Sequence, residues 1–153
     1  MIPAGRLLYI DSSLFVRSLL PDEPGHAAAR EVLTAAAGLA VTWCMAQAEV
    51  SGALRAAAAD GRVPDDMRGI LFDSVFASHD APLLLPGAPG ATTILATAVA
   101  GRQSVRALDA IHIATALTEA RTAAMGVPAI FTTLDNRQAE AARAEGLEVL
   151  VPA

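Results

Sequence analysis

The chain has 153 residues, of which 54% are hydrophobic, and a formal net charge of −5 at pH 7. This length predicts one domain with a sizeable core, no apolar run approaches the roughly 18 residues of a membrane span, and so acidic a chain does not hold nucleic acid through general positive charge. All eleven basic residues are arginine, which excludes a Walker phosphate loop and a Schiff-base lysine.

The cysteine content and the amino terminus predict a cellular compartment. Cys44 is the single cysteine, which excludes an internal disulfide and suits a reducing cytoplasm. Asp11 interrupts the only run near the amino terminus that resembles a secretory signal. We therefore expect a cytoplasmic protein that has no membrane partner.

The first expected strand, residues 7–11, is a short apolar run that ends in a carboxylate, Asp11. A helix cap is the alternative role for Asp11, although Ser12 or Ser13 can already cap the helix that follows. The next expected elements are helices at 13–20 and 25–37 and a strand at 39–43.

The helix expected at 45–60 places a second carboxylate, Glu49, within an apolar stripe. The stripe has the i, i+3, i+4, i+7 spacing of a core-facing surface and consists of Ala46, Glu49, Val50, Ala53 and Ala57. The alternative is a solvent-exposed Glu49 in a register shifted by one residue. A helix at 64–79 and a short strand at 82–86 are expected next.

The helices expected at 91–103 and 107–125 lead to a third carboxylate, Asp109, in a helix that is apolar on nearly every side. His112 lies one turn later, where an imidazole could face a metal, but buried histidines are more often core residues and magnesium sites rarely recruit nitrogen. Arg102 and Arg106 are the arginines best placed to hold a phosphate, and the alternative is a pair of solvated helix-end charges.

The strand expected at 128–134 is followed by a fourth carboxylate, Asp135, which could instead cap the helix expected at 136–145. Ser13 and Thr133 have hydroxyls near the strand ends that can orient a carboxylate or touch phosphate, or can serve as caps and strand-end hydrogen bonds. The last expected strand covers residues 147–151.

Strands separated by helices predict an α/β protein with a central parallel sheet of about five strands and helices on both faces. We expect residues 1–153 to form a single domain. Ligands of such sheets bind at the carboxyl edge of the strands, and isolated buried carboxylates are costly unless they find a cation. The sequence therefore predicts one acidic pocket that holds Mg²⁺ or Mn²⁺, which prefer oxygen ligands. Its residues are Asp11, Glu49, Asp109 and Asp135.

Four segments, in their order and spacing, resemble a known family. They are Leu8-Tyr9-Ile10-Asp11-Ser12-Ser13, Ala48-Glu49-Val50, Arg106-Ala107-Leu108-Asp109-Ala110-Ile111-His112-Ile113-Ala114 and Phe131-Thr132-Thr133-Leu134-Asp135, followed by the ending Gly146-Leu147-Glu148-Val149-Leu150. The chain resembles the PIN-domain nucleases, and within them the VapC-like ribonuclease toxins of type II toxin–antitoxin systems. The resemblance spans nearly the whole chain.

This resemblance implies a PIN-like three-layer fold and a Mg²⁺- or Mn²⁺-dependent endoribonuclease that acts on an RNA substrate. It carries the catalytic and metal-binding roles of the family onto Asp11, Glu49, Asp109 and Asp135. Asp11 and Asp109 are expected to hold the principal ion, while Glu49 and Asp135 position water, complete an outer shell or bind a second ion. A cognate VapB-like antitoxin and a homodimer are implied as partners.

Two other functions are weaker alternatives. A catalytically silent PIN-like binding module is disfavoured because all four acidic positions are filled. An aspartate-based phosphotransfer enzyme with Asp11 as nucleophile is disfavoured because haloacid-dehalogenase-like enzymes place a second Asp at the position of Ser13 and require a lysine.

Overall fold

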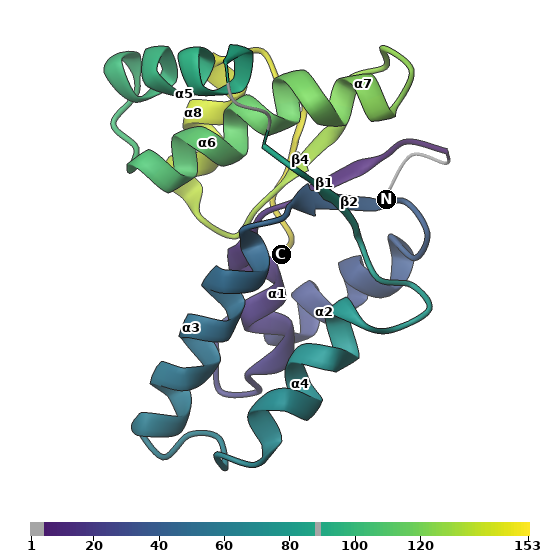
Figure 1. Ribbon diagram of the computed structural model, residues 1–153, viewed down its shortest axis with the longest axis vertical. Helices are drawn as coiled ribbons and strands as arrows, with labels where there is room; N and C mark the ends of the chain where they lie inside the picture. Colours follow the sequence, from purple (N-terminus) through teal and green to yellow (C-terminus); the bar gives the residue numbers. More distant parts are fainter. Residues whose placement is uncertain (1–4, 88–89) are drawn as a thin grey trace.

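The computed structural model describes residues 5–87 and 90–153, and a five-stranded sheet runs through its centre (Figure 1). All strand pairs are parallel, in the order β3-β2-β1-β4-β5. The strands are β1 (Leu8–Ile10), β2 (Ala40–Trp43), β3 (Leu83–Leu85), β4 (Ile130–Thr132) and β5 (Val149–Leu150). Each lies within the range expected for it, and the expected parallel α/β sheet is confirmed.

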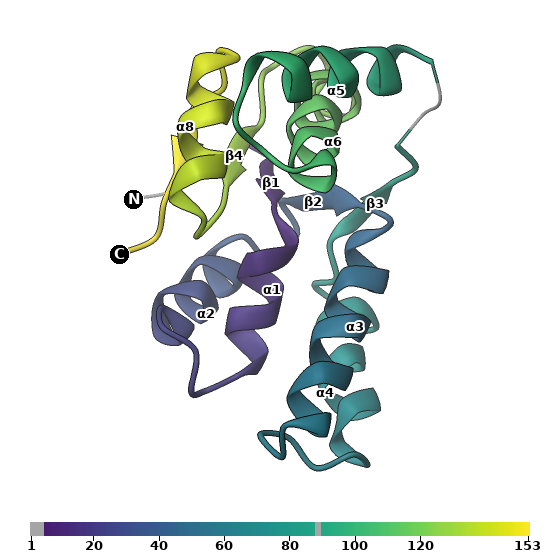
Figure 2. The same ribbon diagram turned by 90° about the vertical axis from the view of Figure 1, so that its left-hand side faces the viewer.

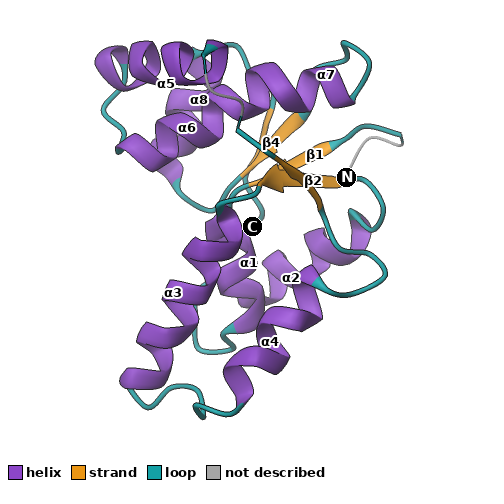
Figure 3. Ribbon diagram, in the orientation of Figure 1, coloured by secondary structure: helices purple, strands orange, loops and turns teal. Residues whose placement is uncertain are grey.

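Two groups of helices cover the two faces of the sheet, as Figures 2 and 3 show. The first group contains α1 (Ser12–Leu19), α2 (His26–Ala35), α3 (Ala46–Ala59) and α4 (Met67–Phe76). The second contains α5 (Ala91–Arg102), α6 (Ala107–Thr115), the π-helical turn η1 (Ala116–Ala120), α7 (Arg121–Ala123) and α8 (Asn136–Ala144). The result is the three-layer arrangement of the expected PIN-like fold.

The central strand β1 contributes to a separate core on each face. Leu8 and Ile10 pack toward α1, α2 and α3, whereas Tyr9 packs toward α5, α6 and α8. All three side chains are completely buried. Since successive residues of a strand point to opposite faces, an uninterrupted apolar run is what a strand covered on both sides requires.

The helix expected at 107–125 is interrupted by a wide turn. Residues 107–123 are helical throughout, but η1 has the i→i+5 bonding of a π-helix. The hydroxyls of Thr115 and Thr118 donate to the carbonyls four residues earlier, at Ile111 and Ala114. Such side-chain bonds compete with the regular backbone ladder, and hydrophobic periodicity does not reveal them.

The start of α1 corrects one expectation from the sequence. The helix begins at Ser12, one residue earlier than expected, so its N-cap is Asp11 and not Ser12 or Ser13. The Asp11 carboxylate accepts a hydrogen bond from the backbone N–H of Ser13 at 3.1 Å. None of the helices within residues 5–87 and 90–153 has the length and apolar character to cross a membrane.

Candidate functional site

A cleft of about 340 Å³ lies at the carboxyl ends of β1 and β4, and all four sequence-predicted carboxylates line it. Asp11 and Asp135 directly precede α1 and α8, and the chain is joined across the two strand ends by a hydrogen bond from Asp11 N to Thr132 O at 3.0 Å. Glu49 and Asp109 lie in the first turns of α3 and α6. The four side chains therefore come from the N-termini of four helices, where the positive end of the helix dipole favours a carboxylate.

Asp11 is buried, with 4% of its surface exposed; neutral groups donate hydrogen bonds to both of its oxygens, and Nε2 of His112 lies 3.7 Å from Oδ1. Oδ2 accepts from the backbone N–H of Ser13 at 3.1 Å and from its hydroxyl at 2.5 Å, and Oδ1 accepts from Nε2 of Gln138 at 3.1 Å. The hydroxyl of Thr133 lies 3.3 Å from Oδ2 but only 2.7 Å from Oε1 of Gln138. Because a hydroxyl has one proton to donate, Thr133 orients Gln138, which in turn orients Asp11.

Glu49 is held by one donor on each oxygen. Its Oε2 accepts from the hydroxyl of Ser12 at 3.1 Å, and its Oε1 lies 2.8 Å from Nε2 of His112. His112 is completely buried and does not line the cleft. Burial disfavours the charged imidazole, but the hydrogen bond to Glu49 and the negative charge of Asp11 outweigh it, so the pKa of His112 lies above its ordinary value.

Asp109 is paired with Arg106, the residue that precedes α6. The guanidinium donates from Nε to Oδ2 at 2.9 Å and from Nη2 to Oδ1 at 3.2 Å, and the backbone N–H of Arg106 donates to Oδ2 at 3.2 Å. The Asp109 side chain is 14% exposed and that of Arg106 is 79% exposed. The pair therefore stabilises the fold little, but it holds Asp109 in one orientation.

Asp135 is the N-cap of α8, as the alternative reading of the sequence had it. Its Oδ1 accepts from the backbone N–H groups of Arg137 at 2.9 Å and Gln138 at 3.1 Å. Asp135 nevertheless lines the same cleft as the other three carboxylates. A cap and a site residue are compatible roles, since both cap bonds use one oxygen of the carboxylate.

The donors in the cleft suit a hard divalent cation, because carboxylate oxygens dominate among the side chains that line it. In the part of the chain that the structure describes, no group of three or more His, Cys, Asp or Glu side chains has the arrangement of a metal site. Asp109 accepts hydrogen bonds from Arg106 at both oxygens, but Oδ1 accepts one bond from this partner and keeps a second lone pair for an ion. The residues present thus fit Mg²⁺ or Mn²⁺ in kind.

The two arginines singled out in the sequence have different positions. Arg106 lines the cleft, whereas Arg102 forms an ion pair with Glu145 at 2.6 Å and does not line it. Ser13 touches Asp11 directly, and Thr133 acts through Gln138. Of the residues considered in sequence, Arg102 is therefore the one that the fold turns away from the carboxylates.

Among the charged and amide side chains that line the cleft, sequence reasoning missed Gln138, Arg17 and Glu23. Gln138 is 1% exposed and bonds Asp11. It lies three residues after the N-cap Asp135, the spacing of a capping box, and that pattern would have drawn attention to it. Arg17 reaches the cleft from α1, one turn beyond Ser13, and no local pattern marks it.

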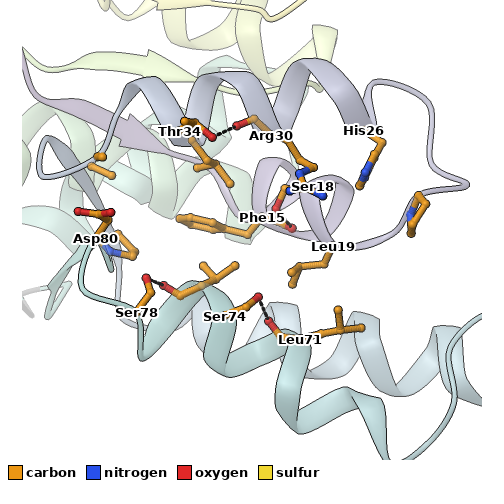
Figure 4. A pocket seen from close by; sticks show the side chains of 16 residues that line it. Phe15, Ser18, Leu19, His26, Arg30, Thr34, Leu71, Ser74, Ser78 and Asp80 are labelled. Carbon is orange, nitrogen blue, oxygen red and sulfur yellow. Dashed lines mark hydrogen bonds between the residues drawn. The ribbon is translucent and has the colours of Figure 1, made fainter.

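A second hollow, of about 550 Å³, lies away from the carboxylates between α1, α2 and α4. Phe15, Leu19 and Leu71 face it from its two sides, and Ser74 of α4 and Ser78, just after α4, lie along one edge (Figure 4). It contains none of the four site carboxylates. This groove is a surface distinct from the candidate active site.

Comparison with known proteins agrees with this geometry. A family model described as the PIN domain matches residues 8–144, a span that contains all four carboxylates. No curated protein matches the chain.

Proposed function

Since this chain belongs to the PIN domain family, whose fold is of the nuclease type, we propose that it is a Mg²⁺- or Mn²⁺-dependent endoribonuclease of the VapC-like toxin kind. The observation that carries the proposal is the meeting of Asp11, Glu49, Asp109 and Asp135, from distant parts of the sequence, in one cleft of about 340 Å³. A helix cap explains Asp11 and Asp135 individually but does not explain why four such groups face one another.

The side chains of the cleft have separate tasks in this proposal. Asp11 and Asp109 hold the principal cation, and Glu49 and Asp135 orient water or an outer shell. A bound divalent ion supplies an activated water and neutralises charge on the phosphate. Arg17 and Arg106 line the cleft as well and offer guanidinium groups to the phosphates of RNA. No protein nucleophile is required.

The proposal is tested with purified protein and total RNA in the presence of Mg²⁺, Mn²⁺ or EDTA, followed by mapping of the cut ends. We expect internal cuts that depend on the added metal. A DNA oligonucleotide of a cleaved sequence serves as the substrate control. Absence of metal-dependent cleavage at micromolar enzyme, or equal cleavage in EDTA, would contradict the proposed activity.

We also propose that a cognate VapB-like antitoxin inhibits the enzyme by binding the side formed by residues 13–37. The groove between α1, α2 and α4 supports this proposal because it combines apolar side chains such as Leu19 and Leu71 with a polar rim. A homodimer is proposed as well, and exposed apolar side chains such as Ile70 and Ile94, 61% and 72% exposed, are consistent with further covered surface.

A further inference from the structure

His112 connects the buried core of the protein to Glu49 in the cleft. Its Nε2 lies 2.8 Å from Oε1 of Glu49, and its Nδ1 lies 2.8 Å from the hydroxyl of Tyr9. The imidazole is completely buried, with the rings of Trp43 and Tyr9 packed edge-on at centroid distances of 5.6 and 5.8 Å. Both nitrogens and the ring plane are therefore constrained.

The direction of one hydrogen bond follows from its partner. A carboxylate only accepts, so Nε2 of His112 must carry the proton that it shares with Glu49. Nδ1 is hydrogen-bonded to the Tyr9 hydroxyl, which can accept or donate according to whether Nδ1 carries a proton. Tyr9 itself is stacked on Phe131 at 5.4 Å and 9°. The bond to Glu49 is thus supported by side chains from the neighbouring strands β1 and β4.

A core role alone does not account for this arrangement. For a histidine that serves only packing, any hydrogen-bond partner in the core would satisfy its nitrogens. Nε2 of His112 instead bonds Glu49, a side chain of the cleft that is 25% exposed. Glu49 is flexible by nature, and the bonds from His112 and Ser12 hold it from two different helices. Both nitrogens of His112 are engaged, which leaves a positioning role in place of direct ligation.

We infer that His112, anchored by Tyr9, is a positioning residue that holds Glu49 toward the metal-binding cleft. This inference rests on the proposed metal-dependent function. Partners that orient a ligating side chain change metal affinity by about 10- to 100-fold when they are removed. Nε2 of His112 lies 2.8 Å from Oε1 of Glu49 and 3.7 Å from Oδ1 of Asp11. Because the hydrogen bond is to Glu49, most of the effect of His112 should disappear when Glu49 can no longer serve.

The test measures Mn²⁺ affinity by isothermal titration calorimetry, with RNA cleavage as a parallel readout. We expect His112→Leu to weaken Mn²⁺ binding about tenfold or more. His112→Gln, whose side-chain amide can offer an N–H near the place of Nε2, should recover most of the affinity. The double variant Glu49→Gln/His112→Leu should bind Mn²⁺ as Glu49→Gln alone does, because coupled residues are not additive.

Two further measurements, NMR of the metal-free protein and thermal melts of the variants, test the role of His112 without added metal. In metal-free protein, ¹⁵N NMR should show Nε2 of His112 protonated and its signal shifted in Glu49→Gln. Thermal melts in EDTA identify variants that fail to fold. If His112→Leu fails to fold, Tyr9→Phe is used in its place. This substitution removes the hydroxyl that bonds Nδ1 of His112 but keeps the ring, and it should weaken Mn²⁺ binding by a smaller factor.

The outcomes separate this inference from the proposed function. Wild-type protein that neither binds Mn²⁺ nor cuts RNA would overturn the proposed function and this inference with it. Wild-type protein that does both, together with a His112→Leu variant within twofold of its Mn²⁺ affinity, overturns the positioning role alone. A loss that adds in full to that of Glu49→Gln would also overturn it, because His112 would then act through Asp11, 3.7 Å from Nε2, or on stability or packing.

Discussion

Arg106 donates hydrogen bonds to both oxygens of Asp109, from Nε to Oδ2 at 2.9 Å and from Nη2 to Oδ1 at 3.2 Å. The guanidinium therefore uses one lone pair on each oxygen of Asp109, and its positive charge opposes a cation bound there. Arg106 also lines the cleft that would receive RNA. One side chain thus competes with the metal for a ligand and offers positive charge to the substrate.

Arg106→Ala should separate these two effects. We expect tighter Mn²⁺ binding, because Asp109 loses its competing partner, and a higher KM for RNA, because the cleft loses a phosphate-binding charge. Calorimetry and steady-state cleavage measure the two quantities. Arg102→Ala is the matched control, since Arg102 pairs with Glu145 outside the cleft and should change neither. Equal effects of the two substitutions would show that only net charge matters.

Asp11→Asn should abolish metal-dependent cleavage, with a loss of orders of magnitude in rate, and leave the fold intact. The substitution removes the ligand charge, but asparagine caps a helix about as well as aspartate does. Cleavage assays at matched metal concentration, with circular dichroism melts in EDTA, check both halves. Cleavage near the wild-type rate would exclude Asp11 from the site.

Asp109→Asn should reduce the stabilisation that Mn²⁺ confers. Ligand binding to the folded state adds stability that grows with the ratio of ligand concentration to its dissociation constant. In EDTA we expect the substitution to cost only about 0–1 kcal/mol, because the Arg106–Asp109 pair is largely exposed on the arginine side. Melts with and without Mn²⁺ test this, and a metal-induced shift as large as that of wild type would contradict a ligand role for Asp109.

The ion pair between Glu145 and Arg102 predicts a pH dependence of stability. The hydrogen bond from Arg102, and a second from Gln103, hold the pKa of Glu145 below its usual value of 4.5. A carboxylate with a lowered pKa stabilises the fold above its unfolded-state pKa, and this contribution is lost as the pH falls through the lowered one. Glu145→Gln should therefore have a free energy of unfolding lower than that of wild type at pH 7, by about 1 kcal/mol or less. This difference should shrink toward pH 3. A difference that does not depend on pH would show that the charge of Glu145 is not responsible.

Ser74→Glu should weaken binding of the cognate antitoxin without changing RNA cleavage. Ser74 lies on the α4 edge of the groove, away from the carboxylates (Figure 4), so a longer charged side chain there obstructs an apolar partner. Ser51→Glu, on the exposed surface of α3 and outside the groove, is the matched control. Binding is measured with purified antitoxin. If both variants bind it as wild type does, the partner uses another surface.

The alternation of strands and helices was predictable because it depends on local hydrophobic periodicity. Asp11 and Asp135 were recognisable from the apolar strands that precede them, and parallel strands bring such ends to one edge. The start of α1 was misplaced by one residue, and with it the cap. The assignment of the four carboxylates as metal ligands stays a prediction.

Long-range side-chain contacts were not predictable from the same patterns. The bond between His112 and Glu49 joins positions 63 residues apart, and that between Gln138 and Asp11 joins positions 127 residues apart. The sequence favoured a core position for His112 but could not name its partner. Likewise, the sequence does not reveal that Arg102 pairs with Glu145 outside the cleft while Arg106 pairs with Asp109.

The convergence of four helix N-termini on the cleft has a consequence for the order in which the site fills. Each helix end contributes roughly half a positive elementary charge, so the four together offset about half of the charge of Asp11, Glu49, Asp109 and Asp135. Arg17 and Arg106, which also line the cleft, offset the remainder, and Glu23 adds one negative charge, so the cleft keeps a net charge of about −1. A bound divalent ion would make this charge positive, and a positive cleft attracts a polyanion. Under the proposed function, RNA therefore binds more readily after the cation than before it.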